Sequence, residues 1–219
     1  MKFDIIFDNL KYILQATSVT IKITLVSFIL SILIGVIIGT IKSSKPPKIV
    51  NFILSVYIEI NRGIPLLILL FFIYYGLPSI GIKMSSFTAA ILGLSLNSGA
   101  YISEIFRTSI LAVPIGQNEA AYTLGMNKFQ ILFHIIYPQA IRIALPPLVN
   151  SFSSVLKDSS LVSVLAITEL TRSGQLIYTR TSRPFEIYLL VGLLYFTMVF
   201  IISTISKILE KNITNKYSI

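Results

Sequence analysis

Three polar residues recur along one face of an otherwise apolar segment near the middle of the chain. Asn97, Tyr101 and Glu104 stand at positions i, i+4 and i+7, so a helix would align them on one stripe about 10 Å long. Ionisable side chains inside apolar helices are costly and usually face the interior of a bundle. The stripe therefore predicts a binding site for a polar ligand. The alternative is that Asn97 and Glu104 only form hydrogen bonds between helices.

A second candidate lies at Asp158 and Ser159, which follow Lys157 at the end of a later apolar segment. The carboxylate of Asp158 suits an ammonium group of a ligand. The backbone N–H groups of a following half-helix, expected over residues 161–167, would suit a carboxylate. Asp158 fits a simple helix cap equally well, and the residues alone leave both alternatives open. The predicted substrate-binding residues are thus Asn97, Tyr101, Glu104, Asp158 and Ser159.

A third group of polar residues, with two charged side chains, interrupts the second apolar segment. Glu59 and Arg62 are three residues apart, which places them on one helical face where they can neutralise each other. We expect a structural or gating pair here, with direct substrate contact as the lesser alternative. Gly63 and Pro65 follow at once and predict a kink.

The residue types needed for catalysis are scarce. The chain has no cysteine and a single histidine, His134, so neither supplies a metal site. No glycine-rich loop ending in Lys-Ser or Lys-Thr occurs, so we expect no ATP site of that kind in this chain. The sequence predicts no catalytic residue, no metal and no cofactor, and a membrane-embedded enzyme is a remote alternative.

The composition is that of an integral membrane protein. Of the 219 residues, 54% are hydrophobic and only 12% charged, and the mean hydropathy is +0.83; such a chain cannot cover itself with polar surface in water. The formal charge of +9 does not indicate nucleic acid, because the Lys and Arg residues lie scattered at the ends of apolar runs. They are typical of signals that set membrane topology.

The apolar segments predict an all-α membrane protein with a single domain over residues 1–219. Residues 1–12 suit a short interfacial helix, and five spans follow, each long enough to cross a bilayer. A polar segment at 107–136 would lie in the cytoplasm between the third and fourth spans, and basic residues favour an outer N-terminus and a cytoplasmic C-terminus. The expected spans are about 13–41, 49–75, 87–106, 138–157 and 187–208.

The polar segment carries a spaced motif. Glu119-Ala120-Ala121 is followed three residues later by Gly125, and then by Ile135 and Pro138. This resembles the coupling loop of bacterial ABC importer permeases, in which Glu-Ala-Ala, Gly, Ile and Leu-Pro recur at these spacings. Every fixed position matches except the Leu, which is Tyr137. The resemblance implies a docking helix at Glu119, Ala120, Ala121 and Gly125 for an ATPase subunit.

Other segments resemble the polar amino acid branch of this family, namely residues 57–67, 94–104 and 116–121. The family usually has Phe-Arg-Gly-Thr-Pro where this chain has Asn-Arg-Gly-Ile-Pro at 61–65. Within the branch, residues 73–78, 144–148, 155–161 and 175–181 look most similar to L-cystine permeases. Permeases for arginine, lysine, histidine or glutamine share the scaffold, so these substrates stay alternatives to cystine.

The resemblance implies a type I ABC importer permease in the bacterial cell membrane. Two permease subunits, identical or similar, would sit in membrane lipid on an ABC ATPase dimer that binds ATP and Mg²⁺. An extracellular binding protein would deliver the amino acid. The rival from another class is a stand-alone secondary carrier. Against it, no internal repeat is visible, and carriers of that kind are often built from two repeats.

Overall fold

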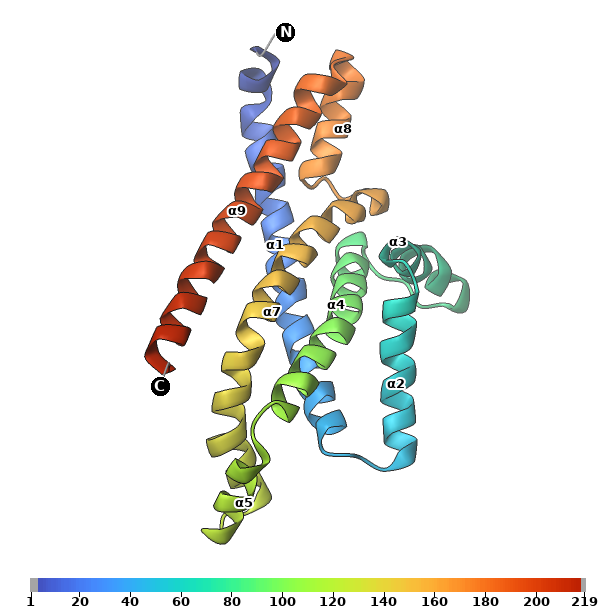
Figure 1. Cartoon of the computed structure of the whole chain (residues 1–219). Coiled ribbons are helices and arrows are strands. Elements are labelled where there is room, and N and C mark those ends of the chain that lie inside the picture. Colours follow the sequence, from blue (N-terminus) through green and yellow to red (C-terminus); the bar gives the residue numbers. More distant parts are fainter. Residues whose placement is uncertain (1–3, 218–219) are drawn as a thin grey trace.

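The computed structural model describes residues 4–217, and every regular element in that range is a helix (Figure 1). Four helical segments of this part are long and apolar enough to cross a membrane, and a sharply bent pair makes up to five. The expected all-α class with about five spans is therefore confirmed. The four segments are Asp8–Ser43, Ser86–Leu111, Lys128–Leu165 and Pro184–Ser206.

Two long helices, α1 (Asp4–Ser43) and α4 (Ser86–Leu111), pack closely against each other. The close approach depends on glycine: a Cβ atom on Gly39 would lie 2.6 Å from the carbonyl oxygen of Ser103. Helix α1 is continuous from Asp4, so residues 4–12 belong to the same helix as the first span and do not form the separate interfacial helix that we expected. Residues 1–3 of that expected helix lie outside the described part.

The second span is broken. Helix α2 (Lys48–Gly63) and the helices after it, α3 (Leu66–Phe71), η1 (Phe72–Gly76) and η2 (Leu77–Ile80), are bent by 107°. Ile64, placed before Pro65, is extended with φ −99° and ψ 133°, because a residue before proline is pushed out of the α region. The break falls where Gly63 and Pro65 predicted a kink, and it divides the expected span over 49–75 into two helical parts.

The expected polar segment over 107–136 is largely helical. Helix α4 continues to Leu111, the short α5 (Ile115–Thr123) follows, and a new helical run starts with α6 (Lys128–Ile131). Asn127 starts this run with a capping box, since its side chain accepts from the backbone N–H of Gln130 at 3.0 Å. The run continues through η3 (Leu132–Ile136) and α7 (Tyr137–Asp158) into η4 (Ser159–Leu165).

The chain ends with α8 (Leu170–Thr181) and α9 (Pro184–Tyr217). Helix α8 packs on the first part of α1 through Ile13, Leu170 and Ile177. It lies with the N-terminus at one end of the molecule, and α5 lies at the opposite end (Figure 1). These two ends are the candidates for the two sides of the membrane.

Candidate functional site

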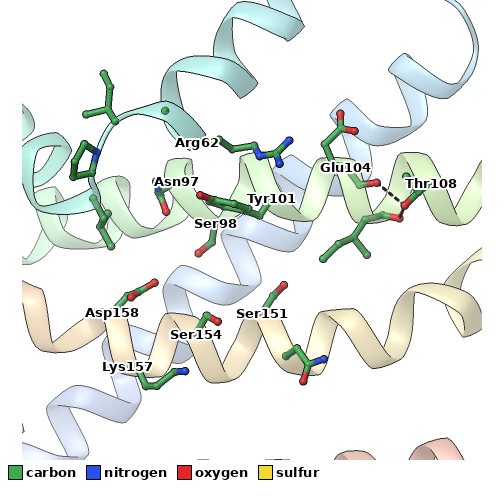
Figure 2. A pocket seen from close by; sticks show the side chains of 16 residues that line it. Arg62, Asn97, Ser98, Tyr101, Glu104, Thr108, Ser151, Ser154, Lys157 and Asp158 are labelled. Carbon is green, nitrogen blue, oxygen red and sulfur yellow. Dashed lines mark hydrogen bonds between the residues drawn. The ribbon is translucent and has the colours of Figure 1, made fainter.

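A cavity of about 860 Å³ lies between the end of α2, the middle of α4 and the last turns of α7 (Figure 2). Four of the five residues predicted to bind substrate line it: Asn97, Tyr101, Glu104 and Asp158. The stripe of Asn97, Tyr101 and Glu104 on α4 and Asp158 on α7 thus line the same cavity. Its volume falls in the range of ligand pockets, about 300–1,000 Å³.

The α4 side of the cavity is fixed by polar contacts with α2. The amide nitrogen of Asn97 donates to the backbone carbonyl of Asn61 at 2.6 Å, and the hydroxyl of Tyr57 donates to the carbonyl of Leu96 at 2.7 Å. Because a carbonyl can only accept, the nitrogen of the Asn97 amide must face Asn61. Its oxygen is left as an acceptor for the cavity.

The same geometry answers whether Asn97 and Glu104 only join helices. Asn97 does form an interhelical bond, yet it also lines the cavity. Glu104 forms no bond to another helix: its carboxylate accepts from Nε of Arg107 at 2.9 Å and lies 2.8 Å from Nη2 of the same residue. Arg107 was not singled out from the sequence, although its i, i+3 spacing from Glu104 was the available signal.

Arg62 lies at the end of α2 with its guanidinium 5.3 Å from the centre of the Tyr101 ring, a cation–π contact (Figure 2). Among the described side chains, no ion pair joins Arg62 to Glu59. The expected Glu59–Arg62 pair is therefore not formed. Arg62 instead lies against Tyr101 of α4 and lines the cavity.

The α7 side carries Ser151, Ser154, Lys157 and Asp158 (Figure 2). Asp158 makes no side-chain capping bond to η4, so the helix-cap alternative does not hold. Ser159 does not line the cavity: it is fully buried, and its hydroxyl donates to the carbonyl of Leu156 at 2.7 Å. Its predicted place beside the ligand is wrong.

The expected half-helix with free N–H groups is also absent here. Helix η4 continues α7 without a break, and the N–H of Ser159 already bonds to backbone carbonyls of Val155 and Lys157. A ligand carboxylate would therefore need other donors. Arg62 and Lys157 are the cations that line the cavity, and Glu104 and Asp158 are its carboxylates. The arrangement suits a small ligand with both charge signs.

Sequence reasoning missed the serines of α7. Ser151, Ser154 and Asp158 stand at i, i+3 and i+7, the same kind of stripe that was recognised on α4. The described residues hold no group of three or more His, Cys, Asp and Glu side chains placed to bind a metal.

At the far end of the molecule, the predicted docking residues are only partly on the surface. Glu119 and Ala120 are exposed on α5, whereas Ala121 is buried against Val113 and Ile131. Gly125 has φ +75°, a conformation that glycine adopts without strain. Large apolar side chains are exposed beside them: Ile115, Leu124 and Phe129 are 74–81% exposed.

Comparison of the chain with known proteins shows which family it belongs to. Residues 31–215 match the family described as "Binding-protein-dependent transport system inner membrane component". The "L-cystine transport system permease protein TcyB" of Bacillus subtilis is 40% identical over 195 residues, 89% of this chain and 83% of the relative. The "Probable glutamine ABC transporter permease protein GlnP" of the same bacterium is 37% identical, over 93% of this chain and 94% of the relative.

A solved structure described as "Crystal structure of an amino acid ABC transporter with histidines" has the same fold. Its TM-score is 0.89 at 36% identity, with 97% of this chain and 99% of the other covered. The chain belongs to the family of inner membrane components of binding-protein-dependent transport systems, in its branch of amino acid ABC permeases.

Proposed function

We propose that this chain is the permease subunit of an ATP-driven importer for a polar amino acid, with L-cystine as the first candidate. The observation that carries the proposal is the cavity between α2, α4 and α7, which is lined by two cations and two carboxylates from these helices. Relatives named for cystine and for glutamine are similar to the chain at 40% and 37% identity. Arginine, lysine, histidine and glutamine are therefore the alternative substrates.

In this proposal, different charged residues of the cavity bind the ammonium and the carboxylate groups of the amino acid. Asp158 receives the α-ammonium group, aided by the amide oxygen of Asn97, and Arg62 receives the α-carboxylate. Glu104 is already paired with Arg107, so it contributes less charge than an unpaired carboxylate. A second ammonium group, as in cystine or arginine, would compete with Arg107 for Glu104.

Transport would be driven from outside this chain. We propose that α5, with Glu119, Ala120, Ala121 and Gly125, docks on an ABC ATPase dimer, which binds ATP and Mg²⁺. The exposed apolar side chains of Ile115, Leu124 and Phe129 support this, because unpartnered apolar surface away from lipid favours a protein partner. A second permease subunit, identical or similar, and an extracellular binding protein complete the importer.

The test is substrate-stimulated ATP hydrolysis by the reconstituted importer with its binding protein. Cystine, arginine, lysine, histidine and glutamine are compared one at a time, and we expect one of them, first cystine, to stimulate hydrolysis and to be taken up. Uptake by the purified chain alone, without any ATPase, would instead support a secondary carrier. Stimulation by none of the five amino acids would contradict the proposal.

A further inference from the structure

A second, smaller cavity of about 360 Å³ adjoins the first. It lies between the end of α1, helix α2 and the second half of α4. Arg62 and Glu104 line both cavities, so their side chains form the partition between the two. The smaller cavity is lined by Lys42, Asn51, Ile58, Glu59, Arg62, Glu104 and Arg107.

The second cavity extends towards the end of the molecule that carries α5. Lys42 and Asn51 flank the turn between α1 and α2, and Figure 1 shows this turn towards the end that carries α5. The first cavity runs along α4 from Pro65 and Asp158 to Thr108, and only the second cavity reaches the α1–α2 turn. A ligand that moved from the first cavity past Arg62 and Glu104 would therefore move towards α5.

The charges of the second cavity are only partly matched within the chain. Glu104 and Arg107 form an ion pair at 2.8 Å. Lys42 donates through Nζ to the neutral hydroxyl of Ser55 at 2.9 Å. Among described residues, neither Lys42 nor Glu59 has an ion-pair partner of opposite charge. The cavity thus holds an ammonium group and a carboxylate that can receive the two ends of a zwitterion.

We propose that this cavity is an inner station for the transported amino acid, occupied between the main cavity and release on the α5 side. Lys42 receives the α-carboxylate and Glu59 the α-ammonium group. The partition opens when Arg62 leaves the Tyr101 ring and Glu104–Arg107 swings aside. The inference rests on the proposed function, since it needs a zwitterionic amino acid as the substrate.

The first test removes the charge of Lys42. In the complete importer, Lys42→Gln is expected to lower the maximal uptake rate about threefold or more. The ratio of that rate to the half-saturating substrate concentration should not change, because release follows the committed steps. Lys42→Arg should restore the rate. The matched control is Lys48→Gln, an exposed lysine nearby that does not line the cavity.

If Lys42→Gln only impaired assembly of the importer, the maximal uptake rate and its ratio to the half-saturating substrate concentration would fall together. A purely structural role of Lys42 therefore gives a different result. Equal maximal rates in Lys42→Gln and Lys48→Gln importers would overturn the inner station.

The second test uses the absence of native cysteine. Asn51→Cys places a single thiol in the cavity, and Ser44→Cys places one on the exposed turn outside it. Each importer is treated with a charged methanethiosulfonate in inside-out vesicles without nucleotide. Arginine, lysine, histidine, glutamine or cystathionine is added; cystathionine is the thioether counterpart of cystine and cannot react with the thiol.

We expect the transported amino acid, or cystathionine if cystine is transported, to slow labelling of the Asn51→Cys variant about threefold or more. Labelling of Ser44→Cys should not change. If uptake is intact but Asn51→Cys is not protected, the inner station is wrong while the proposed function stands. If the wild-type importer transports none of the candidate amino acids, the proposed function fails and the inner station with it.

Discussion

Asp158 differs from the other carboxylate of the cavity in what surrounds it. Glu104 has Arg107 as a close partner, whereas Asp158 has no hydrogen bond or ion pair within the described chain, and Lys157 is its neighbour in sequence. A carboxylate kept at a cavity without a cap or ion pair offers its full acceptor capacity to a ligand. This difference supports the proposal that Asp158, more than Glu104, receives the ammonium end of the substrate.

The first prediction follows from that assignment. Asp158→Asn should raise the substrate concentration that half-stimulates ATP hydrolysis by about tenfold or more, since a hydrogen bond to a charged group contributes about 1.5–3 kcal/mol. Basal hydrolysis should change little. The control is Ser159→Ala, because Ser159 is buried away from the cavity. A normal response in Asp158→Asn importers would show that this carboxylate does not bind the substrate.

Residue types and spacing predicted four of the side chains that line the cavity. They were less successful in predicting which charged side chains form ion pairs. Glu59–Arg62 and Glu104–Arg107 have the same i, i+3 spacing, yet only the second pair forms. The guanidinium of Arg62 instead lies over the ring of Tyr101 on the neighbouring helix α4. Since this contact is tertiary, spacing alone could not have distinguished the two pairs.

At the scale of elements, the α1–α4 contact depends on the absence of a side chain. A Cβ atom on Gly39 would lie 2.6 Å from the Ser103 carbonyl oxygen and 2.8 Å from Cβ of Phe106. Both neighbours are held in α4, one of them as backbone, so neither can move away easily. Gly192 on α9 has no atom within 4 Å of such a Cβ and provides a matched comparison.

We therefore predict opposite effects of one substitution at two sites. Gly39→Ala should destabilise the protein by about 1–3 kcal/mol through overpacking. Gly192→Ala should be neutral or stabilising by up to about 1 kcal/mol, because alanine is the better helix former. Thermal unfolding of both variants in the same detergent measures this. Equal midpoints for the two variants would contradict the close α1–α4 packing.

Helix α8 is attached to the bundle through a buried carboxylate. Glu169 is fully buried and caps α8, accepting from the N–H of Thr171 at 2.9 Å and of Arg172 at 2.8 Å. The hydroxyl of Tyr195 on α9 donates to it at 3.0 Å, and that of Thr20 on α1 at 3.5 Å. One side chain thus ties three helices together.

Burial raises the pKa of the Glu169 carboxyl above its ordinary value of 4.5, although these hydrogen bonds act in the opposite direction. The folded protein then holds this proton more tightly than the unfolded chain does. The resulting stabilisation is complete below about pH 4.5 and is lost as the pH rises through the folded-state pKa. We predict that the Glu169→Gln variant does not lose this stabilisation as the pH rises, because glutamine cannot titrate.

The measurement compares unfolding midpoints of wild type and Glu169→Gln at several pH values between 4.5 and 7.5. The difference should shift in favour of the variant as the pH increases. A difference that stays constant with pH would show that Glu169 does not titrate differently in the folded and unfolded states.

The elements themselves were predictable to different degrees. Hydrophobic runs located the long helices, because crossing a membrane demands length and apolarity over many residues. The 107° bend was underestimated as a kink, since Pro65 shows where a helix must stop and the packing of α3 decides how far the chain turns. The helical run that contains the expected span over 138–157 begins at Lys128, where a capping box at Asn127 starts it.

At the scale of the whole molecule, the larger cavity lies between two chemically different ends. The α5 end carries Glu119 and exposed apolar side chains. The other end carries α8, whose N-terminus is fixed by Glu169, and the turn to α9 at Ser182. The cavity between α4 and α7 lies between these ends. An importer needs this separation, because the delivering protein and the ATPase must act from opposite sides of the membrane.

The last prediction tests that separation directly. Because the chain has no cysteine, Ser182→Cys and Thr123→Cys each introduce a single exposed thiol, one at each end. On intact cells, a membrane-impermeant thiol reagent should label the Ser182→Cys variant and not the Thr123→Cys variant; in inside-out vesicles the pattern should reverse. This outcome would place α5 in the cytoplasm, where an ATPase can reach it, and α8 with the first part of α1 outside. Labelling of Thr123→Cys on intact cells would put the proposed docking helix on the wrong side of the membrane, and no ATP-driven mechanism could then act through it.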